Sequence, residues 1–331
     1  MACCGYASLT WWLLGFPDRA LGKSGDALTL ARESPHTYSL GFALHTAAWL
    51  RQYRQEGQAL QEYAEEEIRL SEEDGFALWL AVGTILRGWV LSEQGARAEG
   101  LAQMHEGLPA FTATGAALSQ PYHLALLAQA HGKNGHPYEG LALLDQALAS
   151  VDKTGERYYE AELYRLQGEL TLKQVEVLSS ESEEESQKAK VKAPKSKVPN
   201  PQSAIPNPQS EAETCFLQSL AISRQQQAKS WELRASMSLA RLWHQQGKTT
   251  DARELLEDIY EWFTEGFDTK DLQDAAALLR ELGGRVKTGE ESQKSKGKSQ
   301  KAKVETADQE DETRIAHSPI RPFVLPPAPS T

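Results

Sequence analysis

The chain has 331 residues, a hydrophobic fraction of 40%, a charged fraction of 24% and a formal net charge of −11. This acidic balance argues against a nucleic-acid partner, which needs a basic face to displace counterions from phosphates, and against an anionic membrane surface. With three cysteines and no apolar run of about 18 residues, the sequence predicts neither a disulfide framework nor a membrane span, and we expect a cytoplasmic protein.

Apolar residues recur at helical spacing along most of the chain, and no segment shows strand alternation. The pattern predicts six helix hairpins and a capping helix. The first helices are expected near residues 6–14, 36–55, 76–94, 120–134, 156–174 and 230–246. The second helices are expected near 17–33, 58–74, 97–113, 137–153, 210–227 and 249–264, and the capping helix near 269–283. Pro109 falls inside one of these helices and is expected to bend or split it.

A register of 40 residues relates the first helices to one another. Small residues recur along it at Ser8, Ala48, Gly88, Ala128 and Gly168. In three repeats a turn glycine and a second small residue follow, as in Gly95 and Gly100 after Gly88. Glycine suits a tight turn because it tolerates a positive φ, and small residues let two helix backbones approach closely. In the second repeat we expect the turn at Gly57, two positions late, and the fifth repeat ends at Val175, where a glycine was due.

The register returns near the C-terminus, at Ala240, Gly247 and Ala252, once 32 residues are taken out. The stretch that would be removed is rich in Ser, Glu, Lys and Pro and has too little apolar surface to offset its ordering entropy. We therefore expect helical repeats over 1–177, a disordered insertion over 178–209, repeats again over 210–283 and a disordered tail over 284–331. We also expect the chain to begin inside a hairpin, as a truncated gene product or one with a separately encoded partner would.

The small–turn glycine–small pattern resembles tetratricopeptide repeats, whose period is about 34 residues. A closer resemblance is to the helical C-terminal region of large bacterial, often cyanobacterial, signalling proteins with a cyclase or kinase and a predicted ATPase. Four segments carry it: LGFPDRAL (14–21), TGERYYEAELYRLQGEL (154–170), SLARLWHQQGK (238–248) and YEWFTEGFDTKDLQDA (260–275). The resemblance implies an all-α, tetratricopeptide-like α-solenoid that binds proteins and regulates an attached ATPase or nucleotide cyclase. The alternative is an adenylate or guanylate cyclase or ATPase in its own right, although those catalytic parts are absent here.

Catalytic and metal motifs lack their required context. Gly22, Lys23 and Ser24 match part of a phosphate-binding loop, but its earlier glycine is Pro17 and the context is helical. His131 and His136 flank a hairpin turn without an acidic or cysteine partner at metal-ligand spacing. We expect no catalytic residue, cofactor, metal or small-molecule substrate, and hence no enzyme.

The register also places a set of aromatic and charged residues on the first helices. Tetratricopeptide-like solenoids present these helices on a concave face, where a protein or peptide partner would bind. The predicted partner-binding stripe is His45, Trp49, Trp89, Gln129, Arg165, Glu169 and Arg241. Trp and Arg dominate interface hot spots, but large aromatics also serve cores, and the alternative is that Trp49 and Trp89 pack between helices. For the charged members, the alternative is an exposed surface without a partner.

Overall fold

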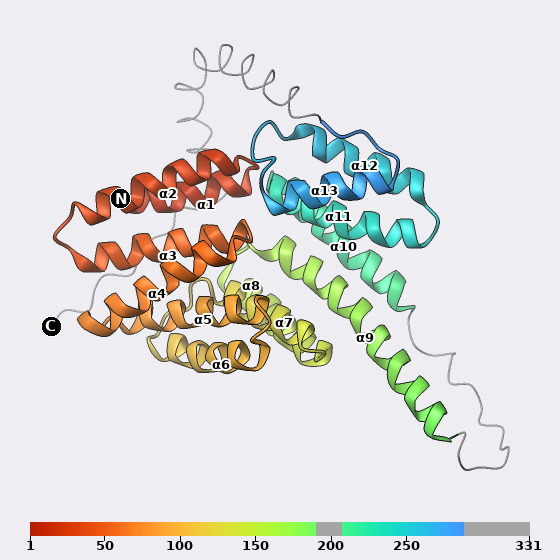
Figure 1. The fold of residues 1–331 in the computed structure, drawn as a ribbon, viewed down its shortest axis with the longest axis horizontal. Helices are drawn as coiled ribbons and strands as arrows, with labels where there is room; N and C mark the ends of the chain where they lie inside the picture. Colours follow the sequence, from red (N-terminus) through yellow and green to blue (C-terminus); the bar gives the residue numbers. More distant parts are fainter. Residues whose placement is uncertain (190–206, 288–331) are drawn as a thin grey trace. The chain divides into compact units, whose positions relative to one another are not determined.

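In a computed structural model of the protein, the described residues are 1–189 and 207–287 (Figure 1). Within these ranges the chain is all-helical and no residue is in a strand. The first helices are α1 (Ala2–Leu13), α3 (Thr37–Tyr53), α5 (Ala77–Glu93), α7 (Gln120–Lys133), α9 (Glu160–Ala189) and α11 (Lys229–Gln245). The second helices are α2 (Pro17–Arg32), α4 (Gly57–Asp74), α6 (Arg97–Ala113), α8 (Pro137–Thr154), α10 (Pro208–Gln225) and α12 (Thr249–Trp262), followed by α13 (Lys270–Glu281).

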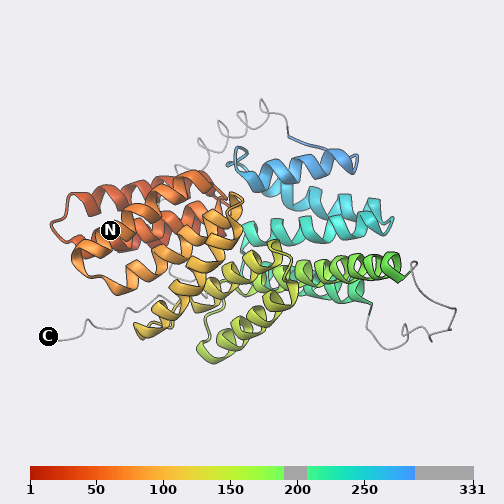
Figure 2. The same ribbon diagram turned by 60° about the horizontal axis from the view of Figure 1, so that its bottom comes forward.

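The predicted fold class is confirmed: the protein is an all-α, tetratricopeptide-like α-solenoid. Each helix contacts the next one along the chain, and each first helix from α1 to α9 contacts the following first helix. Successive hairpins are therefore stacked side by side (Figures 1 and 2). No helix in the described ranges has an apolar stretch long enough to cross a membrane. Helices α1 and α2 pack together as a hairpin.

Residues with left-handed backbone conformation follow the 40-residue register. Within the hairpins these are Gly15, Gln55, Gly95, Gly135 and Gly247, with φ between 57° and 100°. The turn predicted at Gly57 is wrong, because Gln55 adopts φ 57° at the regular position and Gly57 is already the first residue of α4. A glutamine tolerates this conformation at some conformational cost, so the register persists where its glycine is lost.

The small residues allow two helix backbones to touch. A Cβ atom on Gly88 would lie 2.7 Å from the carbonyl oxygen of Gly100, and one on Gly100 would lie 2.4 Å from that of Gly88. A Cβ on Gly140 would similarly lie 2.8 Å from the Ala128 oxygen. Since these separations are shorter than van der Waals contact, α5 against α6 and α7 against α8 can pack this closely only with glycine at those positions.

Two helices are more continuous than expected. Pro109 does not split α6, which runs without interruption from Arg97 to Ala113; Pro109 is exposed, so the carbonyl that it leaves without an N–H donor can be hydrated. Helix α9 does not end near Val175 but continues to Ala189, into the segment predicted as a disordered insertion. No glycine or proline interrupts the chain between Gly168 and Ala189, which allows the helix to propagate. Residues 190–206 of that insertion and 288–331 of the predicted tail lie outside the described residues.

The first and last hairpins contact each other. Helix α1 touches α11, and the Ser230 hydroxyl donates a hydrogen bond to the Trp12 carbonyl. The Glu265 carboxylate accepts hydrogen bonds from the backbone N–H groups of Asp18 and Arg19, both at 3.0 Å, in the first turn of α2. Such N–H groups have no partner within their own helix, so this carboxylate caps α2 from the far end of the sequence.

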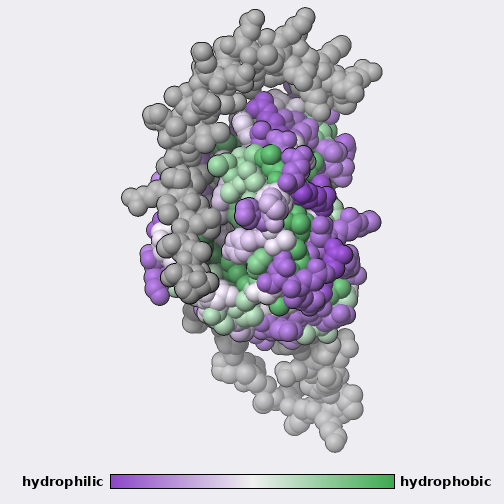
Figure 3. All heavy atoms as spheres, turned by 90° about the vertical axis from the view of Figure 1, so that its left-hand side faces the viewer, coloured by the Kyte–Doolittle hydropathy of each residue, from purple (hydrophilic) through white to green (hydrophobic). Residues whose placement is uncertain are grey.

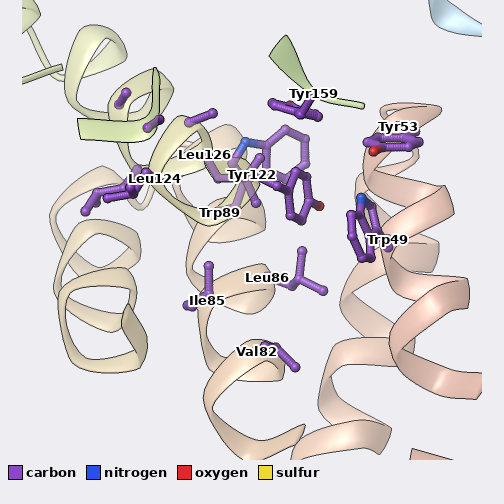
Figure 4. Packing of buried hydrophobic residues seen from close by; sticks show 14 of the residues in the cluster. Trp49, Tyr53, Val82, Ile85, Leu86, Trp89, Tyr122, Leu124, Leu126 and Tyr159 are labelled. Carbon is purple, nitrogen blue, oxygen red and sulfur yellow. The ribbon is translucent and has the colours of Figure 1, made fainter. Parts of the chain in front are cut away.

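An aromatic hub lies where these ends meet. It consists of Trp12, Trp49, Tyr53, Tyr122, Tyr159 and Trp231, all at most 5% exposed. The carboxyl ends of α1 and α3 here meet the amino ends of α7 and α11 and the residue before α9, and ring centroids such as those of Trp12 and Trp231 are 4.7 Å apart. Figure 4 shows the Trp49, Tyr53, Tyr122 and Tyr159 side chains converging from these elements. Burying each large aromatic contributes about 1.5–3 kcal/mol before entropy is counted, so the hub is a major tie between the two ends.

Candidate functional site

The aromatic part of the predicted stripe is buried. His45, Trp49 and Trp89 are 6%, 5% and 4% exposed. Trp49 is stacked on Tyr122, with centroids 4.6 Å apart and planes at 17° (Figure 4). These side chains therefore pack between neighbouring helices, as the alternative interpretation had it, and a partner cannot reach them directly in this conformation.

His45 belongs to a buried polar pair beneath the stripe. Its Nδ1 atom lies 3.4 Å from Oε1 of Glu67, a residue of α4 that is fully buried. Burial raises the pKa of the Glu67 carboxyl, and the neighbouring His45 opposes part of that rise. The pair is a contact between α3 and α4 inside the core and is not positioned to meet a partner.

The accessible part of the stripe begins with Gln129 on α7, which is hydrogen-bonded to the buried Trp89. The indole Nε1 of Trp89 donates a hydrogen bond to Oε1 of Gln129 at 2.9 Å. One turn further along the same two helices, Lys133 forms an ion pair with Glu93. Both pairs join residues 40 apart in sequence, so equivalent positions of adjacent repeats do meet as the register predicts. Gln129 is partly exposed, and Trp89 holds its carboxamide in place.

On α9 the stripe is built from charges. The guanidinium of Arg165 donates to both carboxylate oxygens of Glu162 at 2.7 Å and also pairs with Glu169. Its NH1 atom lies 3.3 Å from the hydroxyl of Ser238 on α11, which in turn donates to Glu169 at 3.0 Å. Arg165 is only 8% exposed, so the expectation of an exposed arginine is wrong at this position. The reason is that the two carboxylates compensate its charge inside the protein.

Glu169 and Arg241 remain open to solvent. The Glu169 side chain is 36% exposed and Arg241 is exposed. Partial burial alone would raise the pKa of the Glu169 carboxyl, but Arg165, Ser238, Lys173 and Arg241 together lower it. Glu169 is therefore an anion at neutral pH, beside the cation of Arg241. We call Gln129, Glu169 and Arg241 the accessible stripe.

The charges below the accessible stripe extend to the hub. Arg234 on α11 lies 3.7 Å from Glu162, pairs with Asp271 of α13 and donates to the Tyr53 carbonyl. We call Glu162, Arg165, Glu169, Arg234 and Asp271 the ion cluster. Burial disfavours the charge on Arg234, but Asp271 and Glu162 outweigh it and raise the pKa of the guanidinium. The cluster thus connects α9, α11, α13 and the end of α3.

Sequence reasoning missed Glu162, Arg234 and Asp271. A signal for the first two exists in the register, where Phe42, Val82, Tyr122, Glu162 and, after the insertion, Arg234 are equivalent. Three apolar residues are followed by two of opposite charge. Because equivalent positions of stacked repeats lie next to one another, that change predicts a buried ion pair.

The segments considered for other chemistry lie in helices or at turns. Gly22, Lys23 and Ser24 lie in the middle of α2, so their backbone N–H groups point along the helix and cannot cradle a phosphate. Lys23 pairs with Asp26 at 3.1 Å on the surface. Among the described residues, no group of three or more His, Cys, Asp or Glu side chains is arranged to hold a metal ion. On the face shown in Figure 3, hydrophobic residues are interspersed with hydrophilic ones.

The fold is that of a tetratricopeptide-like repeat protein. No protein-family model matches the chain. An uncharacterised protein of Rhizobium meliloti (strain 1021) is 22% identical over 172 residues, which make up 52% of this chain but 17% of that protein. The match thus spans less than a fifth of the relative's length.

Two solved structures share the fold. The apo form of RapI superposes with a TM-score of 0.50 at 12% identity, over 84% of this chain and 83% of that one. A Rap protein complexed with competence and sporulation factor superposes with a TM-score of 0.52 at 12% identity, over 85% of this chain and 72% of that one. At this level of identity the similarity shows the fold alone.

Proposed function

We propose that the protein is a helical-repeat scaffold that binds a protein or peptide partner at the accessible stripe. The observation that supports this most is that Gln129, Glu169 and Arg241 lie at equivalent positions of three adjacent first helices and remain open to solvent. Their side chains are held from below, Gln129 by Trp89 and Glu169 by Arg165 and Ser238. Groups fixed in this way lose little entropy on binding, which favours affinity.

The chemistry of the stripe suits a polar partner segment with both charges. A carboxamide, a carboxylate and a guanidinium offer donors and acceptors to an extended peptide or to one face of a helix. His45, Trp49, Trp89 and Arg165 then act as supports beneath the contact surface. The complex of a Rap protein with competence and sporulation factor is consistent with a fold of this kind holding a partner. We also propose that this protein acts in the cytoplasm.

A peptide array tests this proposal even while the partner is unidentified. Glu169→Gln and Arg241→Ala should each lower the affinity of the purified protein for the peptides that it binds. Replacing a hot-spot residue costs about 2 kcal/mol or more of binding free energy, a loss of roughly thirtyfold in affinity. Glu73→Gln and Arg69→Ala, on the exposed face of α4, are matched controls and should leave binding unchanged. Array binding that survives both stripe substitutions would contradict the proposed site.

A narrower second proposal follows from the resemblance to signalling proteins: the scaffold regulates an ATPase or nucleotide cyclase. In its favour, the Rhizobium meliloti relative carries the matched segment within a much longer chain. In this role the scaffold itself has no nucleotide chemistry, so the purified protein should not turn over ATP or GTP. Saturable nucleotide binding that Lys23→Ala removes would overturn that expectation.

A further inference from the structure

Three histidines lie near the turn between α7 and α8: His105 on α6, His131 on α7 and His136 in the turn itself. Nε2 of His105 on α6 and Nε2 of His131 on α7 are 3.1 Å apart, with ring planes at 79°. The ring of His136, just before α8, lies 6.2 Å from that of His131. Its Nδ1 atom is 3.8 Å from Glu139 in the first turn of α8. His105 is 26 residues from His131 in sequence, so their proximity is a product of the fold.

We propose that His105 and His131 form a two-histidine site for a divalent transition-metal ion of the zinc, nickel and copper class. Imidazole nitrogens bind such ions at about 2.0–2.1 Å, and two of them at tetrahedral angles are roughly 3.3 Å apart. The observed separation of the two Nε2 atoms is 3.1 Å. The two rings are therefore already spaced to bind one ion with little rearrangement.

Charges near the pair favour an incoming cation. Glu139 provides a negative charge close by, and the whole chain carries a formal charge of −11. His105 is exposed, which gives an ion a route from solvent.

Water completes the coordination of the ion. Since no three potential ligands converge in the part of the chain that the structure describes, the protein contributes two nitrogens and solvent the remaining positions. Glu139, whose side chain is 56% exposed, acts through its charge and not as a ligand, and His136 is not a ligand either. In the metal-free protein one Nε2 atom donates a hydrogen bond to the other, so the test must distinguish that bond from coordination.

Glutamine substitutions make this distinction, because a carboxamide can still form a hydrogen bond but lacks the imidazole nitrogen. Tag-free protein carrying Cys3→Ser and Cys4→Ser, which removes the adjacent pair of thiols near the N-terminus, is titrated with zinc chloride at pH 7.5 by calorimetry. We expect saturable binding of one ion, weakened at least tenfold by His105→Gln and by His131→Gln. His136→Gln and the distant His36→Gln are controls and should change the affinity less than threefold.

Copper(II) provides a second readout that does not depend on affinity. The electron paramagnetic resonance spectrum of the bound ion should show two imidazole nitrogens in the starting protein and one after His105→Gln, with unchanged circular dichroism. Absence of saturable zinc binding, or retention of two nitrogens after that substitution, overturns the site. An equal loss in His136→Gln would also overturn the assignment of the two ligands.

Discussion

Replacing Arg234 with methionine should destabilise the fold by about 3–5 kcal/mol, because it removes one partner of a buried ion pair. Nε of Arg234 donates to both carboxylate oxygens of Asp271 at 3.0 Å, and the guanidinium also donates to the Tyr53 carbonyl. The guanidinium carbon of Arg234 lies 5.0 Å from the ring centroid of Trp12 and 5.1 Å from that of Trp231. Methionine fills a similar space without a charge or hydrogen-bond donors. The aromatic hub would therefore lose its connection to α13, which Arg234 makes through Asp271.

The measurement is urea unfolding followed by circular dichroism, with thermal unfolding alongside. For a domain of this size the predicted loss corresponds to a fall in melting temperature on the order of 10 °C. Amide hydrogen exchange should accelerate first in α1, α13 and the end of α3, because Arg234 connects α11 to those segments. The matched control is Arg224→Met, which removes an exposed guanidinium from Glu232 while Lys229 still pairs with that carboxylate, and it should cost only about 0–1 kcal/mol.

A double-mutant cycle separates the ion pair from simple loss of packing. Asp271→Asn alone leaves the guanidinium with Glu162 at 3.7 Å and should be destabilising. The variant Arg234→Met with Asp271→Asn removes both charges and should lose less than the sum of the two single losses, by about 0.5–3 kcal/mol. Additive losses below about 1 kcal/mol each would refute the view that this pair joins the two ends of the repeat array.

Other predictions test the core and the turns. Burial, and then His45, lower the pKa of His123 from 6.5 to about 3, so the folded state favours its neutral form. Its contribution is complete above pH 6.5 and is lost as pH falls: urea unfolding at pH 5 should show about 2 kcal/mol less stability than at pH 7, a difference that His123→Phe reduces. Gly100→Ala should cost about 1–3 kcal/mol in urea unfolding, since its Cβ would lie 2.4 Å from the Gly88 oxygen, and an unchanged midpoint would contradict that contact. Gln227→Gly, at φ 56°, should stabilise by about 0.5–1 kcal/mol in thermal unfolding, whereas Gln55→Gly should not, because Gln55 also donates to Asp271 at 2.7 Å.

The fold could be predicted from sequence because its signals are local and repeated. A turn glycine such as Gly95 and close-packing residues such as Gly88 and Gly100 act within one hairpin, and the same requirement recurs in each repeat. A second series of turns, between successive hairpins at Gly75, Gly115, Gly155 and Gln227, keeps the same 40-residue spacing once the insertion is allowed for. Two independent sets of turns therefore specify one register.

The predictions that failed depend on information outside one hairpin. At Gln55 a turn keeps its conformation without glycine, and the side chain bonds to Asp271, 216 residues away. Burial of Trp49 depends on Tyr122, two hairpins further on, and burial of Arg165 depends on Glu162 in its own helix and Ser238 on α11. A periodic pattern indicates which residues are equivalent. It does not indicate the angle by which each repeat is rotated relative to the one before. That angle decides whether the inner face of the solenoid is open or filled by side chains.

The inner face of this solenoid is filled in two different ways, and the difference locates the accessible stripe. In the first repeats the equivalent positions are apolar, as at Phe42, Val82 and Tyr122, and the helices close over aromatic side chains. In the last repeats they are Glu162 and Arg234, whose charges need further polar partners at the edge of the core. Those partners lead outward from Glu162 through Arg165 to Glu169, and from Arg234 to Asp271. A partner that competes for Glu169 therefore acts on the same set of charges that joins the two ends of the array.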